Sequence, residues 1–185
     1  FTILLIVFFL FKEAGGLFNT PATEEGYVLA VNKSNDVGKL SPEKIMDIFD
    51  GNITNWKDVS GMDQDILIFR FSDLTNYYAE EELGDEFQYV PQKISELVAK
   101  EPGIIAFFPK QYLLENGFQG KVLPEEKITL GEFFGGTKWY PTSTPAPIFG
   151  LIPLLLGTLL VSIGAIVLSL PFGIAVAIYM AEIAN

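Results

Sequence analysis

The feature that most constrains this chain is an apolar run near its C-terminal end, where residues 148–181 contain no charged side chain. As one α-helix, this run would measure about 50 Å, against a bilayer hydrocarbon core of about 30 Å. One span fits and two do not. We therefore predict a long transmembrane helix in residues 148–185, tilted or kinked, with its entry near the interface. Pro153 suits a helix start, and Pro171 lacks the N–H of a regular helix and would kink it.

Small side chains recur along this run at every fourth position. Such a ridge would let a second helix approach closely. Alanine and glycine are also common in membrane helices generally, so the alternative is that the spacing has no packing role. We predict that the helix belongs to a bundle and packs through Ala165, Ser169, Gly173 and Ala177, with Ala181 continuing the series.

A second uncharged run opens the sequence, where residues 1–11 read FTILLIVFFLF. Eleven residues are too few for a span of about 20, but the chain begins with Phe rather than Met. We predict that residues 1–11 are the end of a first transmembrane helix. The alternative is the apolar part of a signal peptide, although neither a preceding basic stretch nor a clear cleavage site accompanies it.

The polar part of the chain lies between these runs. All 12 basic residues, and all but one of the 23 acidic residues, fall within residues 12–147. An acidic domain without a basic stripe argues against nucleic-acid binding. The chain has no Cys and no His, which excludes disulfides, thiolate and imidazole metal ligands, and His-based catalytic triads. With a span on either side, the positive-inside rule weakly favours an extracytoplasmic domain.

Within residues 12–147, short apolar runs alternate with helical patterns, which predicts an α/β domain with helices on the faces of a sheet. Ser41 and Pro42 are typical of a helix start, and Gly51 of a helix end. We expect Trp56 to anchor the following turn in the core. The predicted strands are 27–31, 66–71, 103–108 and 121–123, and the predicted helices are 40–51, 73–83, 92–100 and 110–114.

The last fifty residues carry an ordered set of motifs. They contain Trp139-x-Pro, Phe149-Gly-x-x-Pro, Gly157-Thr-Leu, Pro171-x-Gly and a closing Ala181-Glu. This set resembles phosphate ABC transporter permeases of the PstC type. The resemblance implies a permease subunit in the bacterial inner membrane, working with a second permease subunit, an ATP-hydrolysing subunit and a phosphate-binding protein.

The domain itself resembles something different. Residues 40–58 read LSPEKIMDIFDGNITNWKD, and residues 98–107 read VAKEPGIIAF. Both stretches are similar to one lobe of PstS-like periplasmic phosphate-binding proteins, and the resemblance covers residues 27–123. It implies a single periplasmic-binding-protein-like lobe, residues 12–147, inserted between two transmembrane helices.

In those binding proteins, a strand ending in Arg leads into a Ser-Gly-Thr turn, where free N–H groups hold the anion. The resemblance places Arg70, Ser72 and Thr75 at the corresponding positions, as a degenerate phosphate site. The Ser-Gly-Thr itself is absent, and Asp73 would occupy or repel the anion. The alternative is structural, with Arg70 paired to an acid and Ser72 or Asp73 serving as helix caps.

Taken together, the chain is interpreted as the N-terminal part of an importer permease for inorganic phosphate. The lobe would dock the binding protein or shape the translocation mouth. The alternative is a membrane-tethered extracytoplasmic phosphate-binding or sensor module. No spacing of acidic residues marks a catalytic pair, so we predict neither an enzyme nor a cofactor. The acidic run Glu80, Glu81, Glu82, Asp85 and Glu86 lacks EF-hand spacing and predicts a solvated face rather than a metal site.

Overall fold

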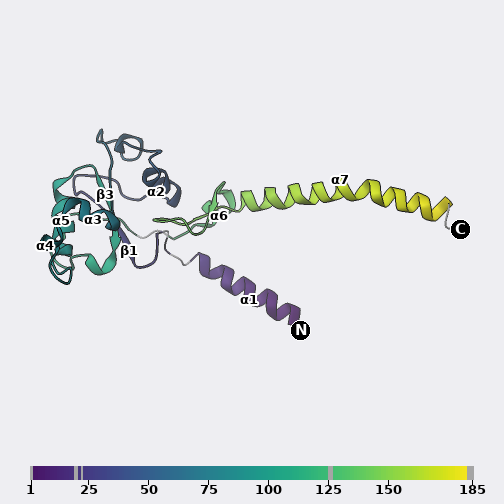
Figure 1. Ribbon diagram of the computed structural model, residues 1–185, viewed down its shortest axis with the longest axis horizontal. Helices are drawn as coiled ribbons and strands as arrows, with labels where there is room; N and C mark the ends of the chain where they lie inside the picture. The colour runs from purple at the N-terminus through teal and green to yellow at the C-terminus, as the bar shows by residue number, and fades with distance from the viewer. Residues whose placement is uncertain (1, 19–20, 22, 125–126, 183–185) are drawn as a thin grey trace. The chain divides into compact units, whose positions relative to one another are not determined.

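The computed structural model of the chain describes residues 2–18, 21, 23–124 and 127–182. Two compact units make up the chain (Figure 1): residues 1–129 with 140–148, and residues 130–139 with 149–185. Phe1 and residues 183–185, which belong to the predicted first and last segments, lie outside the described residues.

The first unit is built around a mixed four-stranded sheet. Its strands are β1 (Tyr27–Val31), β2 (Leu67–Arg70), β3 (Ile104–Pro109) and β4 (Lys121–Val122), in the order β2-β3-β1-β4. β1 pairs antiparallel with β3 and β4, and β2 pairs parallel with β3. The predicted α/β class is confirmed, and each predicted strand forms within two residues of its expected bounds.

The central strands send alternate side chains to opposite faces of the sheet, as the two-residue period of a strand requires. One hydrophobic cluster contains Val28 and Ala30 of β1, and the other contains Leu29 and Val31. β3 divides in the same way, with Ile104, Ala106 and Phe108 on the first face and Ile105 and Phe107 on the second. Both faces are buried, which is why these strands read as continuous apolar runs.

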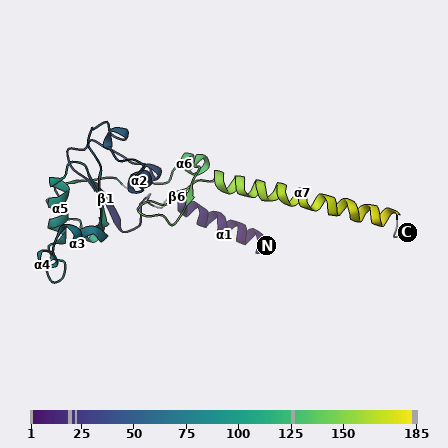
Figure 2. The same ribbon diagram turned by 45° about the horizontal axis from the view of Figure 1, so that its top comes forward.

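The first face is covered by α5 (Val90–Lys100) with two short helices, α3 (Leu74–Tyr77) and α4 (Glu80–Leu83). These three helices gather on one side of the sheet in both Figure 1 and Figure 2. α5 buries Val90, Ile94, Leu97 and Val98, which lie on one helix face by their spacing of three and four residues.

The second face is covered by α2 (Pro42–Phe49) and the turn that follows it. As predicted, Ser41 caps this helix and its hydroxyl accepts the Lys44 N–H at 3.4 Å. Trp56 opens the turn η1 (Trp56–Asp58) and is fully buried. Its indole N–H donates to the Gly103 carbonyl at 2.8 Å, which confirms its predicted role as an anchor.

The single helix predicted over residues 73–83 is wrong. The chain instead forms the turn η2 (Phe71–Asp73), then α3, and then α4 after a break. Tyr78 and Ala79 adopt extended backbone angles at the break, and the Glu82 carboxylate accepts the Ala79 N–H at 3.1 Å. This contact starts a new helix. The helix expected at 110–114 is a short turn, η3 (Lys110–Tyr112).

At the start of the chain, residues Thr2–Leu17 form the helix α1. It continues beyond the apolar run of residues 1–11 and through Lys12. Its 16 residues correspond to about 24 Å, less than the thickness of a hydrocarbon core. The second unit contains α6 (Leu130–Gly135) and α7 (Ile152–Glu182), and the two-residue strands β5 (Trp139–Tyr140) and β6 (Ile148–Phe149) pair with each other.

α7 is one continuous helix of 31 residues, and it passes through Pro171 without a break (Figure 1). It begins four residues later than predicted, with Pro153 at its second position. Across the described part of the chain, it is the one helix that is long and apolar enough to cross a membrane. The four residues predicted to pack against another helix, Ala165, Ser169, Gly173 and Ala177, are all exposed on it.

Candidate functional site

The candidate anion site lies where the edge strand β2 ends. Arg70 is the last residue of β2, Ser72 lies in the turn η2, and Thr75 lies in the short helix α3. A parallel strand that turns into a helix is where open α/β sheets commonly bind ligands. Here the helix is only four residues long, so its dipole contributes little to anion binding.

The carboxylate of Asp73 accepts hydrogen bonds from within this turn. Asp73 Oδ2 accepts the Arg70 backbone N–H at 3.2 Å, and its Oδ1 accepts the Ser72 hydroxyl at 3.3 Å. The sequence raised the possibility that Asp73 would occupy the anion position, and in the structure its carboxylate contacts two groups of the same turn. One backbone amide and one hydroxyl of this turn are therefore already donated to the carboxylate of Asp73.

The Arg70 side chain turns toward the C-terminal end of α2. Its Nη2 donates to the Phe49 carbonyl at 2.9 Å, and its Cζ lies 5.0 Å from the centre of the Phe49 ring. The hydrogen bond satisfies a carbonyl in the last turn of α2, a position where positively charged side chains are favourable. Arg70 therefore joins β2 to α2, a contact that its sequence position alone did not indicate.

Three aromatic rings pack next to one another beneath the Arg70 guanidinium, on the side of the sheet core. The Phe49 ring meets Phe107 edge-on at a centroid distance of 6.1 Å, and Phe107 stacks on Tyr27 at 4.7 Å. Phe107 is also the residue of β3 that pairs with Arg70 in the sheet register. The guanidinium is thus held over a packed part of the core, which fixes its orientation.

The three predicted site residues lie in consecutive elements but have different neighbours. Arg70 contacts Phe49, Ser72 contacts Asp73, and Thr75 is exposed on α3. Within the residues that the structure describes, the recorded hydrogen bonds do not connect these three side chains to one another.

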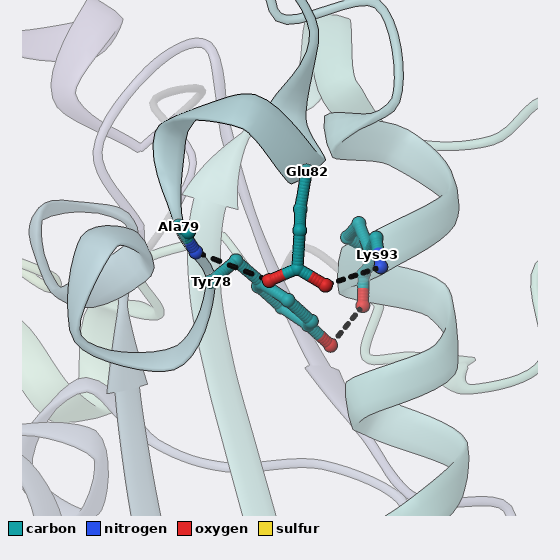
Figure 3. Close-up of polar contacts among 4 residues, drawn as sticks. All are labelled: Tyr78, Ala79, Glu82 and Lys93. Atoms are coloured by element: carbon teal, nitrogen blue, oxygen red, sulfur yellow. Dashed lines mark hydrogen bonds and ion pairs between the residues drawn. The ribbon is translucent and has the colours of Figure 1, made fainter.

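A second polar cluster lies beside this turn and holds α4 against α5 (Figure 3). Glu82 accepts the Ala79 N–H and also pairs with Lys93 at 3.3 Å. The Tyr78 hydroxyl donates to the Lys93 carbonyl at 3.1 Å, and the Lys93 ammonium lies 4.9 Å from the Tyr78 ring centre. No spacing in the sequence predicts this cluster as a whole. The only clue to it is a Glu three residues after Ala79, the spacing by which a side chain caps a helix start.

Two pKa values shift in this cluster. The hydrogen bond from the Ala79 backbone lowers the pKa of Glu82, and Lys93 lowers it further. Partial burial raises the pKa of Tyr78, and the nearby carboxylates of Glu96 and Glu82 add to that effect. Both shifts favour the states that these contacts require at neutral pH, an ionised Glu82 and a neutral Tyr78. The cluster therefore joins α4 to α5, and we call it the α4–α5 lock.

The acidic residues around α4 do not gather into a metal site. Over the described ranges, which omit residues 125 and 126, no three Asp or Glu side chains converge in a geometry that could hold an ion. Glu80, Glu81, Asp85 and Glu86 are exposed to solvent.

Comparison with known proteins places this geometry in a family context. A model for the PBP superfamily domain matches residues 8–156. An ABC-type phosphate transport receptor from Vibrio cholerae is 23% identical with a TM-score of 0.41, over 60% of this chain and 50% of that one. A putative phosphate ABC transporter substrate-binding protein with bound phosphate from Clostridium perfringens is 24% identical with a TM-score of 0.38, over 56% and 46%.

A possible phosphate-binding protein from Planctomyces limnophilus is 16% identical with a TM-score of 0.40, over 69% of this chain and 52% of that one. This chain therefore spans about half the length of the solved structures that it matches.

Proposed function

The chain belongs to the PBP superfamily, and from this premise we propose that it is the N-terminal, membrane-tethered part of a phosphate importer's permease subunit. The α/β lobe and the apolar helix α7 support a binding-protein-like domain attached to a membrane. The permease assignment goes further, and it is supported by the PstC-like motifs between Trp139 and Glu182. Phosphate is the transported anion that this resemblance implies.

We further propose that the lobe, residues 12–147, is extracytoplasmic and follows a first membrane helix that ends with residues 1–11. In this arrangement, α7 begins the permease core in a bacterial inner membrane. A second permease subunit, an ATP-hydrolysing subunit and a phosphate-binding protein would complete the transporter. The small residues of α7, including Ala165, Ser169, Gly173 and Ala177, offer a surface for a neighbouring helix.

The lobe's own role is accessory, and the Asp73 contact carries this part of the proposal. A phosphate at the end of β2 would have to displace the Asp73 carboxylate from the Arg70 N–H. It would also meet that carboxylate as a like charge at close range, which is unfavourable. Because Asp73 occupies this turn, we infer that the lobe does not bind phosphate itself. Its role is instead to dock the phosphate-binding protein or to shape the translocation mouth.

The alternative is a membrane-tethered module that binds phosphate itself or senses it. One observation favours it: Arg70, Ser72 and Thr75 lie in consecutive elements, the end of β2, the turn η2 and the helix α3. In this alternative, phosphate replaces Asp73 as the acceptor of the Arg70 N–H.

Calorimetry on the full chain in detergent distinguishes the two functions. Phosphate is titrated first, and the phosphate-binding protein of the same transporter is titrated second. We expect no heat from phosphate at micromolar concentrations, and heat from the binding protein. Micromolar phosphate binding would support the receptor alternative, and silence toward the binding protein would contradict docking.

A matched pair of variants tests the Asp73 argument directly. Asp73→Gly removes the internal carboxylate and supplies the missing Gly, so we expect it to gain measurable phosphate binding. Asp85→Gly makes the same chemical change at an exposed position of the lobe and should gain none. If Asp73→Gly shows no phosphate binding, the Asp73 carboxylate is not what prevents phosphate from binding at this turn.

A further inference from the structure

The helix α7 does not itself specify its depth in a membrane. Its 31 residues correspond to about 46 Å, roughly 16 Å more than a hydrocarbon core requires. Its first charged residue is Glu182 at the far end. A uniformly apolar helix of this length can slide or tilt at small cost, so structures at its ends must set its depth.

Such a structure lies at the N-terminal end of α7. Three backbone hydrogen bonds join residues 150–152, the two residues before α7 and its first residue, to α6 and the residues that follow it. Gly150 N–H donates to Lys138 O at 2.8 Å, Leu151 N–H to Phe133 O at 2.8 Å, and Ile152 N–H to Gly136 O at 3.3 Å. We call residues 130–139 and 149–151 the collar.

Two glycines allow this close backbone contact. A Cβ on Gly136 would lie 2.7 Å from the Gly150 Cα, and a Cβ on Gly150 would lie 2.4 Å from the Gly136 carbonyl oxygen. Neither backbone can move aside without breaking the hydrogen bonds beside it. The two parts of the collar therefore pack tightly against each other directly before α7.

The collar presents aromatic and aliphatic side chains outward. Leu130 and Phe134 are 60% and 59% exposed. Phe134 meets Phe133 edge-on at 5.3 Å, and Trp139 meets Phe149 edge-on at 5.6 Å. Residues 130–139 also include the charged Glu132 and Lys138. Aromatic rings next to charged groups suit the headgroup layer, where Trp and Tyr are enriched.

We propose that the collar is a membrane-interface anchor that seats in the phospholipid headgroup layer and fixes the depth of α7. Its partner is the lipid surface itself. The collar is continuous with α7, because Ile152 in the first turn of α7 donates its N–H to Gly136 O. The side chains of α7 are exposed or half-exposed throughout. This inference rests on the proposed insertion of α7 into a membrane.

The tryptophans provide a test in the full chain. The protein has two, and Trp56 is fully buried in the lobe while Trp139 is half-buried in the collar. The chain is reconstituted in phosphatidylcholine vesicles whose acyl chains carry bromine, a fluorescence quencher, either near the headgroup or near the bilayer centre. We expect quenching by the shallow bromines, less by the deep ones, and loss of this quenching in Trp139→Phe, which leaves Trp56 alone.

Two glycine-to-alanine variants test the close backbone contact between Gly136 and Gly150, which we call the clamp. Gly150→Ala would force the collar backbone apart, whereas a Cβ at Gly157 in α7 meets nothing within 4 Å. We expect Gly150→Ala to lose shallow quenching and to expose Trp139 to aqueous acrylamide. Gly157→Ala should retain the wild-type pattern. Identical quenching in wild type and Gly150→Ala would overturn the claim that the clamp positions the collar.

The outcomes separate this inference from the proposed function. If the chain does not float with the vesicles in a density gradient, membrane insertion fails and the collar proposal fails with it. If the chain floats but Trp139 is quenched by acrylamide or by the deep bromines alone, the collar proposal fails and insertion stands. If Trp139 is shielded from both bromine and acrylamide, a protein surface covers the collar, which overturns the lipid assignment.

Discussion

The lobe and the helix α7 are both rich in apolar residues, but these residues are buried in the lobe and exposed on α7. In the lobe, the side chains of β1 and β3 are packed on both faces of a sheet, and residues such as Ala106 and Phe108 are fully buried. In α7, comparable residues such as Leu160 and Phe172 are 73% exposed.

Under the proposed membrane insertion of α7, this difference reflects two solvents, water for the lobe and lipid for α7. The lobe removes apolar area from water by packing against itself, so its stability is internal. α7 satisfies its backbone hydrogen bonds within one helix and leaves its side chains outward, which is the solution that lipid favours. The predictions below test this contrast, from the largest expected effect to the smallest.

The largest effect comes from removing the same ring in each unit. Phe108→Ala leaves a cavity in the first face of the sheet, and we expect the free energy of unfolding to fall by about 3–5 kcal/mol. Phe172→Ala removes an exposed ring and should leave the lobe unchanged. Urea titration of the full chain in detergent, followed by Trp56 fluorescence, measures both. Equal effects of the two variants would mean that the two units share a core.

The second prediction places one charge in each unit. Leu168→Arg puts a charge near the middle of α7, and we expect it to weaken membrane partitioning by about 3 kcal/mol. Tyr89→Arg puts the same charge on the lobe surface, where Tyr89 is already 48% exposed. Flotation with phosphatidylcholine vesicles gives the bound fraction of each variant. Loss of flotation by Tyr89→Arg, with Leu168→Arg unaffected, would reverse the assignment of the membrane-bound unit.

The third prediction concerns a hydroxyl in each unit. Ser41→Ala removes the N-cap of α2, so the free energy of unfolding of the lobe should fall by about 1 kcal/mol. Thr158→Ala removes a hydroxyl that already donates to Leu154 O within α7, and the lobe should not respond. Thermal unfolding by circular dichroism compares them, and a stable Ser41→Ala variant would show that the cap does not hold α2.

The smallest effect is the pH dependence of the α4–α5 lock. Because the pKa of Glu82 is lowered in the folded lobe, its contribution is present above the unfolded pKa and is lost as pH falls through the folded pKa. Glu82→Gln should therefore flatten the acid limb of lobe stability. Glu81→Gln changes the charge equally without removing the Ala79 and Lys93 contacts, so it should keep the wild-type slope. The test is to measure the denaturation midpoint of each variant from neutral pH down to a pH below the usual pKa of a carboxylate.

Local chemistry predicted those parts of the fold that short sequence windows determine. The run from Tyr27 to Val31 is apolar, has β-branched or aromatic residues at three of its five positions, and forms the expected strand. Ser41 and Pro42 mark the start of α2 because capping needs only residues a few positions apart. The break at Tyr78 and Ala79 was missed because acidic residues favour helix locally, whereas Glu82 and Lys93 close the break across a distance of eleven residues.

The candidate site divides in the same way. The family resemblance gave Arg70 as the end of a strand, whereas the residues alone predicted a strand that continued through Phe71. The possibility that Asp73 would fill the turn also came from comparing this stretch with the family's motif. The bond from Arg70 to the Phe49 carbonyl did not, since these residues are far apart in the chain and meet only when α2 packs on the sheet. The collar was also missed because α6, β5 and β6 are too short to show a hydrophobic period.

Hydrogen exchange of the full chain in vesicles, read by mass spectrometry at increasing urea, tests the contrast between the two units most directly. The account predicts that peptides from β1, β3 and α5 lose protection together at the lobe's midpoint. Peptides from α7 should keep their protection well beyond it, because lipid rather than the lobe shields them. Simultaneous loss of protection in β3 and α7 would contradict the account, since it would show one cooperative unit rather than two.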